Sequence, residues 1–160
     1  MIRPAGPADV PVIHQLIRDL AEYERSLPHV TGTPEQLHGA LFGPDPAVFA
    51  HVAEHDGRIA GFALWFLNFS TWQCQHGLHL EDLYVRPELR GYGYGRQLLQ
   101  TLAALCVERG YSRLEWVVLD WNEPAIGFYR ALGAVGMDDW TTFRLAGPAL
   151  AQVAAARSGD

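Results

Sequence analysis

Two cysteines among 160 residues are too few for a disulfide framework. Cys106 falls on the apolar face of a predicted helix and is expected in the core, whereas Cys74 is expected to be a free thiol in a loop. No apolar run approaches the length of a membrane span, and we expect no signal peptide before the first strand. These absences argue against a disulfide-stapled secreted domain and a membrane protein, and they favour a cytoplasmic protein.

The chain also lacks clusters of basic residues, internal repeats and linkers, and its formal net charge is −6. This charge argues against a nucleic-acid partner and agrees with a small cationic substrate. Because 49% of the residues are apolar, the chain is expected to fold around its own core. A length of 160 residues predicts one domain spanning 1–160, with a frayed tail over 146–160, where small residues dominate.

The sequence does contain a regular succession of helical and strand patterns. Helices are predicted after Gly6-Pro7, after the capping box Thr33-Pro34-Glu35-Gln36, from the glycine-rich stretch to Gly110, and over 123–132. Strands are predicted over 2–3, 47–54, 58–67, 78–85, 112–119, 134–137 and 141–145, with a hairpin turn at Asp56-Gly57 and a loop over 68–77. This order predicts an α/β fold with a mixed central sheet.

The most informative stretch is Arg90-Gly91-Tyr92-Gly93-Tyr94-Gly95, which lies between a predicted strand and a predicted helix. Glycines at alternate positions leave backbone N–H groups uncovered. Unpaired N–H groups and the helix dipole at a helix N-terminus favour an anion. The stretch therefore predicts a phosphate-binding loop and favours a pyrophosphate as its ligand.

Several phosphate ligands compete for this loop. A Walker A loop requires Lys and then Ser or Thr after its last glycine, but Arg96 and Gln97 follow Gly95. A dinucleotide fingerprint requires its third glycine one residue later and an acidic residue at the end of the next strand. Arg90, Gly93 and Gly95 satisfy a third pattern, Arg-x-x-Gly-x-Gly, and a glycine-rich turn without any ligand is the remaining alternative.

A second motif lies downstream and supports the third pattern. Residues 121–134 resemble the signature Asn-x-x-(Ala/Ser)-x-x-(Phe/Leu)-Tyr-x-x-x-Gly of the GCN5-related N-acetyltransferase (GNAT) superfamily, whose Arg-x-x-Gly-x-Gly loop binds acetyl-coenzyme A. Stretches elsewhere resemble its diamine branch, the spermidine/spermine acetyltransferases and their thialysine-acetylating relatives: 2–5, 69–72, 80–85 and 120–122. The resemblance covers most of the chain, from residue 2 to residue 145.

The resemblance implies a GNAT-type sheet of about six to seven strands flanked by about four helices, acetyl-coenzyme A as cosubstrate without a metal, and a homodimer. Tyr129 is then the general acid that protonates the departing thiolate, and a core tyrosine is the alternative. Asn122 is then a hydrogen-bond partner of the pantetheine arm. The full set implied to bind the cosubstrate is Leu83, Tyr84, Val85, Arg90, Gly91, Tyr92, Gly93, Tyr94, Gly95, Arg96, Asn122 and Tyr129.

Acidic and aromatic residues are the candidates for binding the amine. By resemblance, Glu81 accepts the amine proton through a water, and Asp82 lies near the cationic substrate. Glu24 and Trp72 match substrate-binding positions, with a solvated helix-end charge and simple loop packing as their alternatives. Strand alternation predicts one face with His79, Glu81, Leu83 and Val85 and another with Leu80, Asp82 and Tyr84.

His79 could relay a proton beside Glu81, or it could simply pack. The spacing of Cys74, His76 and His79 matches no closed zinc pattern, so no metal site is predicted. The resemblance thus implies an N-acetyltransferase that acts by direct attack of a small diamine or diamino acid. Acetylation of an antibiotic amine or a protein lysine, and a non-catalytic acyl-coenzyme A-binding module, are the alternatives.

Overall fold

The computed structural model describes residues 1–159, which form two compact units: Met1–Leu119, and the remainder from Asp120. The expectation of a single domain stays a prediction. The first unit contains β1 (Ile2–Pro4), η1 (Pro7–Asp9), α1 (Val10–Tyr23), η2 (Leu27–His29), α2 (Pro34–Phe42), β2 (Phe49–His55), β3 (Arg58–Ser70), β4 (Gln75–Val85), η3 (Pro87–Leu89), α3 (Tyr94–Arg109) and β5 (Leu114–Glu115).

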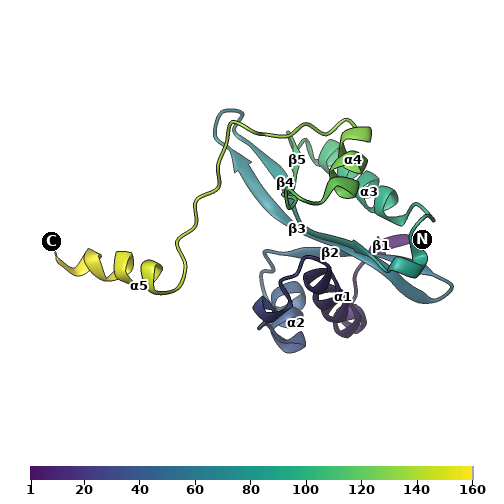
Figure 1. The fold of residues 1–160 in the computed structure, drawn as a ribbon, viewed down its shortest axis with the longest axis horizontal. Helices are drawn as coiled ribbons and strands as arrows, with labels where there is room; N and C mark the ends of the chain where they lie inside the picture. Colours follow the sequence, from purple (N-terminus) through teal and green to yellow (C-terminus); the bar gives the residue numbers. More distant parts are fainter. Residues whose placement is uncertain (160) are drawn as a thin grey trace. The chain divides into compact units, whose positions relative to one another are not determined.

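The five strands form one sheet in the order β1-β2-β3-β4-β5 (Figure 1). All neighbouring pairs are antiparallel except β4 and β5, which run parallel. Helices α1 and α2 lie on one face of the sheet and α3 lies on the other. The predicted α/β class with a mixed sheet is confirmed, with five strands in the described residues instead of six or seven.

Several boundaries of helices and strands lie where the local sequence predicted them. Asp56 and Gly57 have φ values of 46° and 76°, the left-handed pair that a tight hairpin turn requires. The N–H of Gln36 donates to Thr33 Oγ1 and caps α2, and α3 ends at Gly110 with φ 70°. The predicted loop over 68–77 is shorter, because β3 and β4 continue into a long hairpin and leave only residues 71–74 as the turn.

A β-bulge interrupts β4 at Glu81. Asp82 pairs with Leu64 of β3, but the next residue of β3, Trp65, pairs with Leu80. Glu81 is therefore one residue more than the partner strand can match. Since residues directly opposite one another share a face, Asp82 lies on the face of Leu64 whereas Leu80 lies on the face of Trp65.

The predicted alternation along β4 is therefore wrong across residue 81. His79 pairs with Phe66, so it shares a face with Asp82 and Tyr84 and lies opposite Leu83 and Val85. Regular alternation cannot anticipate this change, because the bulge depends on pairing with β3.

Apolar side chains fill both sides of the sheet. The core under α1 and α2 includes Ile13, Leu16, Leu41, Val52, Phe62, Leu64 and Tyr84. On the side of α3, the buried residues include Leu78, Leu80, Leu98, Leu102 and Cys106, so the core position predicted for Cys106 is confirmed. Cys74 is exposed and free, also as predicted. The sheet is thereby held between helices, and the ends of β4 are positioned for the site described below.

The second unit contains α4 (Glu123–Ala131), α5 (Gly147–Ala155) and η4 (Ala156–Gly159). The strands predicted over 134–137 and 141–145 are not formed in the described residues, and β5 is much shorter than the predicted 112–119. Those predictions rested on the pattern of apolar residues, which produces a strand only beside a partner strand. Helix α5 occupies part of the tail that was expected to fray, in agreement with the high helix propensity of its alanines.

Candidate active site

The glycine-rich loop presents a row of unused backbone donors. Gly91 and Gly93 have φ values of 90° and 81°, which side chains rarely permit. The first hydrogen bond of α3 runs from the N–H of Gln97 to the carbonyl of Gly93. Across the described chain, the N–H groups from Gly91 to Arg96 have no hydrogen-bond acceptor. Such a row at a helix N-terminus fits the phosphates of the implied cosubstrate.

Arg90 differs from the rest of the predicted loop. Its backbone N–H donates to Pro87, and its Nε donates to the carbonyl of Val85 at 3.1 Å. Its guanidinium carbon lies 5.7 Å from the ring centroid of Tyr23 and 5.5 Å from that of Tyr84. Its backbone N–H is therefore engaged within the protein, and its side chain is turned toward α1.

Aromatic rings hold the loop against the end of β2. His55 contacts the rings of Tyr92 and Tyr94 with centroid distances of 4.9 and 5.8 Å, and the two tyrosine rings stack on each other at 6.1 Å. Tyr92 remains 59% exposed. Sequence reasoning missed His55, because nothing local connects it to a loop that follows almost 40 residues later.

The bulge places Glu81 at the surface beside His79. The Nε2 of His79 lies 3.6 Å from Oε2 of Glu81, and the His79 ring packs against Phe66 with a centroid distance of 4.9 Å. Both alternatives considered for His79 therefore have structural support. Its ring packs against Phe66, and it also lies close enough to Glu81 to exchange a proton with it.

Asp82 lies in an acidic site that also includes Glu24 and Glu81. Burial raises the pKa of Asp82 to about 6, and the charges of Glu81 and Glu24 add to this effect. Burial also raises the pKa of Glu24. The structure thus brings together the three acidic residues that the sequence suggested. A partly buried group of like charges is costly unless a cation offsets it.

Trp72 is not part of this group within one chain. It is 89% exposed in the turn between β3 and β4. Six residues of extended strand separate Gln75, the first residue of β4, from Glu81, a distance of about 20 Å. Ser70 and Thr71 lie at the same end of the hairpin.

The far edge of β4 leaves backbone groups unpaired by β5. Only Leu78 and His79 pair with β5 in the described residues. Arg86 donates its N–H to Ala60 in β3, so alternation directs the N–H of Tyr84 toward β3 and those of Leu83 and Val85 away from it. Leu83 and Val85 can therefore present donors at this edge, whereas Tyr84 cannot.

Asn122 and Tyr129 belong to the second unit. Asn122 immediately precedes α4, and Tyr129 follows seven residues later, two helical turns along. The two residues therefore share one side of α4, and their roles stay predictions.

Among residues 1–159, no group of three or more His, Cys, Asp or Glu side chains is arranged to hold a metal ion. No helix in this range combines the length and the apolar character needed to cross a membrane.

Comparison with known proteins gives consistent matches. Residues 13–134 match the Acetyltransferase (GNAT) family. The chain is 36% identical to a thialysine N-epsilon-acetyltransferase of Bos taurus, over 96% of each chain. It is 31% identical to an L-ornithine N5-acetyltransferase of Arabidopsis thaliana, over 93% of this chain and 85% of the other. An integron cassette protein of V. cholerae shares the fold, with a TM-score of 0.80, 23% identity and 96% of each chain covered.

Proposed function

Since the chain belongs to the GNAT acetyltransferase family and is an N-acetyltransferase, we propose that it transfers acetyl from acetyl-coenzyme A to a primary amine of a small diamine or diamino acid. The amine attacks the thioester directly within a ternary complex, without a covalent enzyme intermediate. A reducing compartment such as the cytoplasm suits its two free cysteines.

The observation that carries this proposal is the acidic site formed by Glu24, Glu81 and Asp82. Three carboxylates close to one another repel, and burial increases that cost. A substrate with two cationic groups relieves the repulsion, with one ammonium near Glu81 and the other charge farther out. An uncharged arylamine supplies no such compensation, and a protein lysine supplies only one charge.

The attacking amine must first lose a proton, because an alkyl ammonium has a pKa near ~10.4. Glu81 is exposed at the bulge and accepts this proton through a water, and His79, 3.6 Å away, passes it to solvent. Tyr129 gives its phenolic proton to the departing thiolate. The donors of Leu83 and Val85, together with Asn122, hold the pantetheine arm, and the N–H groups of residues 91–96 hold the pyrophosphate.

The names of the relatives favour amino-acid substrates. The two relatives described above act on thialysine and ornithine, both of which carry a side-chain amine. We therefore place thialysine, lysine and ornithine before spermidine. An antibiotic amine remains the second enzymatic candidate. A binding module without turnover is the other alternative, and retention of Asn122 and Tyr129 argues against it.

Trp72 connects substrate binding with the proposed homodimer. The part of β4 between the hairpin turn and Glu81 is about 20 Å long. Trp72, which lies in that turn, therefore cannot reach the acidic site of its own chain. The exposed indole can meet an ammonium only at the site of a second copy. We therefore propose a homodimer in which each hairpin turn contributes Trp72 to the site of the other subunit.

The experiment is a coenzyme A release assay with acetyl-coenzyme A and a panel of amines. The panel contains thialysine, lysine, ornithine, putrescine, spermidine, an aminoglycoside and an acetylatable peptide. The chain contains no lysine, so acetylation of its own lysine side chains cannot contribute to the signal. We expect the highest kcat/KM for a diamino acid. Binding of acetyl-coenzyme A without turnover of any amine would support the binding module instead.

A further inference from the structure

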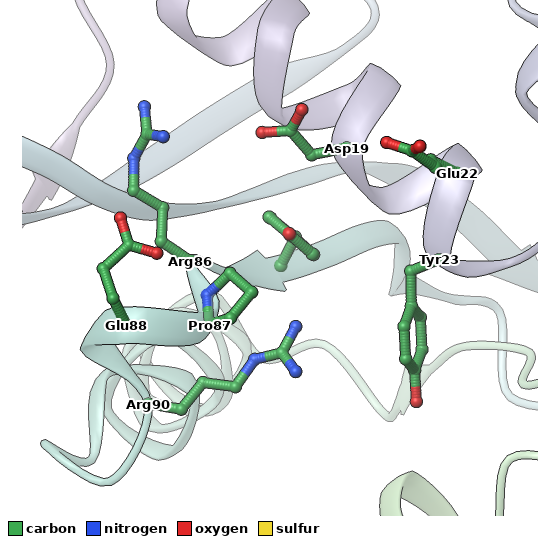
Figure 2. A pocket seen from close by; sticks show the side chains of 8 residues that line it. Asp19, Glu22, Tyr23, Arg86, Pro87, Glu88 and Arg90 are labelled. Atoms are coloured by element: carbon green, nitrogen blue, oxygen red, sulfur yellow. The ribbon is translucent and has the colours of Figure 1, made fainter.

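A pocket of about 410 Å³ lies beside the acidic site, on the α1 side of the first unit. Its walls come from the last turns of α1 and from the chain that follows β4 (Figure 2). The lining residues are Asp19, Glu22, Tyr23, Tyr84, Arg86, Pro87, Glu88 and Arg90. Both signs of charge therefore face the same space.

These charges do not neutralise one another. In the described part of the chain, neither arginine of the pocket forms an ion pair with Asp19, Glu22 or Glu88. Asp19 accepts a hydrogen bond from Gln15 at 2.8 Å. Among residues 1–159, the side chain of Glu22 has no such partner. The pocket thus offers a free cation and a free anion on separate walls, an arrangement complementary to a zwitterion.

Arg90 is the cation best placed to receive a ligand. Figure 2 shows its guanidinium directed across the pocket toward Tyr23. The rings of Tyr23 and Tyr84 hold this guanidinium, and its Nε is already occupied by the carbonyl of Val85. Its two terminal nitrogens keep their N–H groups available, in the planar arrangement that binds a carboxylate through two hydrogen bonds.

The pocket and the acidic site are neighbours along β4. Asp82 and Tyr84 are two residues apart on one face, a separation of about 7 Å. Tyr23 lines the pocket and Glu24 follows it directly in the chain. The four-atom stem of lysine or thialysine spans about 6 Å between the α-carbon and the reacting amine. One molecule can therefore occupy both places.

We propose that this pocket binds the α-amino-acid end of the substrate, with Arg90 on the α-carboxylate and Glu22 on the α-ammonium. The inference rests on the proposed function and deepens it, because it assigns a diamino acid as substrate and not a polyamine. A polyamine brings a second ammonium to this pocket and leaves Arg90 facing a like charge.

The test compares amines that differ by one group. Lysine and cadaverine share the reacting amine and the stem, but cadaverine lacks the carboxylate; 6-aminohexanoate keeps the carboxylate but lacks the α-amine. Arg90→Gln is expected to reduce the ratio of kcat/KM for lysine over cadaverine by about tenfold or more, the loss of a charge-assisted hydrogen-bonded pair. Glu22→Gln is expected to reduce the ratio for lysine over 6-aminohexanoate. Arg58→Gln, an exposed arginine outside the pocket, is the matched control and leaves both ratios unchanged.

Ratios separate this inference from effects on the cosubstrate, because weaker binding of acetyl-coenzyme A lowers the turnover of both amines alike. Calorimetric titration of lysine and cadaverine into the coenzyme A-bound protein gives a second readout and should show the same loss for lysine only. A wild-type enzyme that acetylates cadaverine as well as lysine, or an Arg90→Gln ratio equal to the wild-type ratio, overturns the inference and leaves the acetyltransferase proposal intact. Failure of every amine in the panel overturns the proposed function itself.

Discussion

The Nδ1 atom of His55 and the hydroxyl oxygen of Tyr94 lie 2.6 Å apart, a short hydrogen bond between the end of β2 and the first residue of α3. This bond fixes the start of the helix whose N-terminal N–H groups face the proposed phosphate site. A loop with glycines at left-handed positions loses conformational freedom when it binds a ligand. The contact reduces that loss by holding the loop in place beforehand.

Tyr94→Phe should therefore weaken acetyl-coenzyme A binding by roughly threefold to tenfold, because it removes one hydrogen bond of ordinary strength. Isothermal titration calorimetry measures the dissociation constant. Tyr92→Phe is the control, since it removes a hydroxyl from the neighbouring exposed ring and preserves the stack. An equal effect of the two substitutions would contradict the role of the His55 contact. His55→Asn, which keeps a hydrogen-bonding atom near the position of Nδ1, should restore part of the affinity lost in His55→Ala.

Gly93→Asp should abolish measurable binding of acetyl-coenzyme A. The new carboxylate lies at the helix N-terminus and repels the phosphates, and φ at Gly93 is 81°. Gly110→Asp provides a matched control at the other end of the same helix, where φ is 70°. Both variants carry similar backbone strain, but the helix dipole favours the carboxylate at residue 93 and disfavours it at residue 110, so a thermal melt should show the larger loss of stability for Gly110→Asp. If Gly110→Asp reduced the affinity equally, strain alone would explain the result and the loop assignment would be wrong.

Asp82→Asn should stabilise the ligand-free protein above about pH 6. The pKa of Asp82 is raised from 3.8 to about 6, so ionisation of this group opposes folding. Below pH 3.8 the group is protonated in both the folded and the unfolded state, and the variant gains nothing. As the pH rises from 3.8 through 6 the wild type loses stability, by up to about 3 kcal/mol in total.

Urea unfolding between pH 4 and pH 8 measures this difference. Glu108→Gln, at an exposed position of α3, is the control and should show no such trend. A gain for Asp82→Asn that is the same at pH 4 and pH 8 would show that packing, and not ionisation, is responsible.

Tyr129→Phe should lower kcat by roughly 10²- to 10⁴-fold with little change in the affinity for acetyl-coenzyme A, as expected for a positioned general acid. Steady-state kinetics and calorimetry on the same preparation measure the two quantities. Phe128→Leu, which alters the neighbouring ring, controls for packing within α4. Near wild-type turnover of Tyr129→Phe would mean that water protonates the thiolate.

The proposed homodimer predicts complementation between two defective variants. In a dimer of Trp72→Ala with Glu81→Gln, one site combines the intact Glu81 of one subunit with the intact Trp72 of the other. When equal amounts of the two variants are dissociated and reassociated together, half of the dimers should contain one subunit of each kind. The mixture should therefore recover about a quarter of the wild-type activity. Size-exclusion chromatography establishes the dimer independently. Mixtures that perform no better than the average of the two variants would show that Trp72 does not act across subunits.

The sequence predicted those features that depend on a few consecutive residues. The cap at Thr33, the turn at Asp56-Gly57 and the end of α3 at Gly110 each follow from the chemistry of a single residue or pair. The glycine-rich loop was found in the same way. The three acids were suggested by resemblance, and the structure brings them together through the packing of α1 against the sheet.

Features that depend on distant partners could not be predicted. The contact between His55 and Tyr94 spans 39 positions, and the bulge at Glu81 arises from the register with β3. The strands predicted over 134–137 and 141–145 failed for a related reason, since alternating apolar residues indicate a strand only when a partner is present. The local sequence matched Trp72 to a substrate-binding position, but the length of the hairpin between β3 and β4 determines where Trp72 lies.

The bulge makes the chemistry of β4 depend on the number of its residues as well as on their identity. Leu80 and Asp82 have the same parity in the sequence and opposite orientations in the sheet, so β4 changes sides at Glu81. Deleting a single residue at this point would restore uninterrupted alternation. Leu80 and Asp82 would then be adjacent and would keep the opposite orientations that they already have, so the deletion would remove only the bulged residue. The extra residue thus lets β4 present Glu81 at the surface while the residues before and after it keep the faces that uninterrupted pairing with β3 would give them.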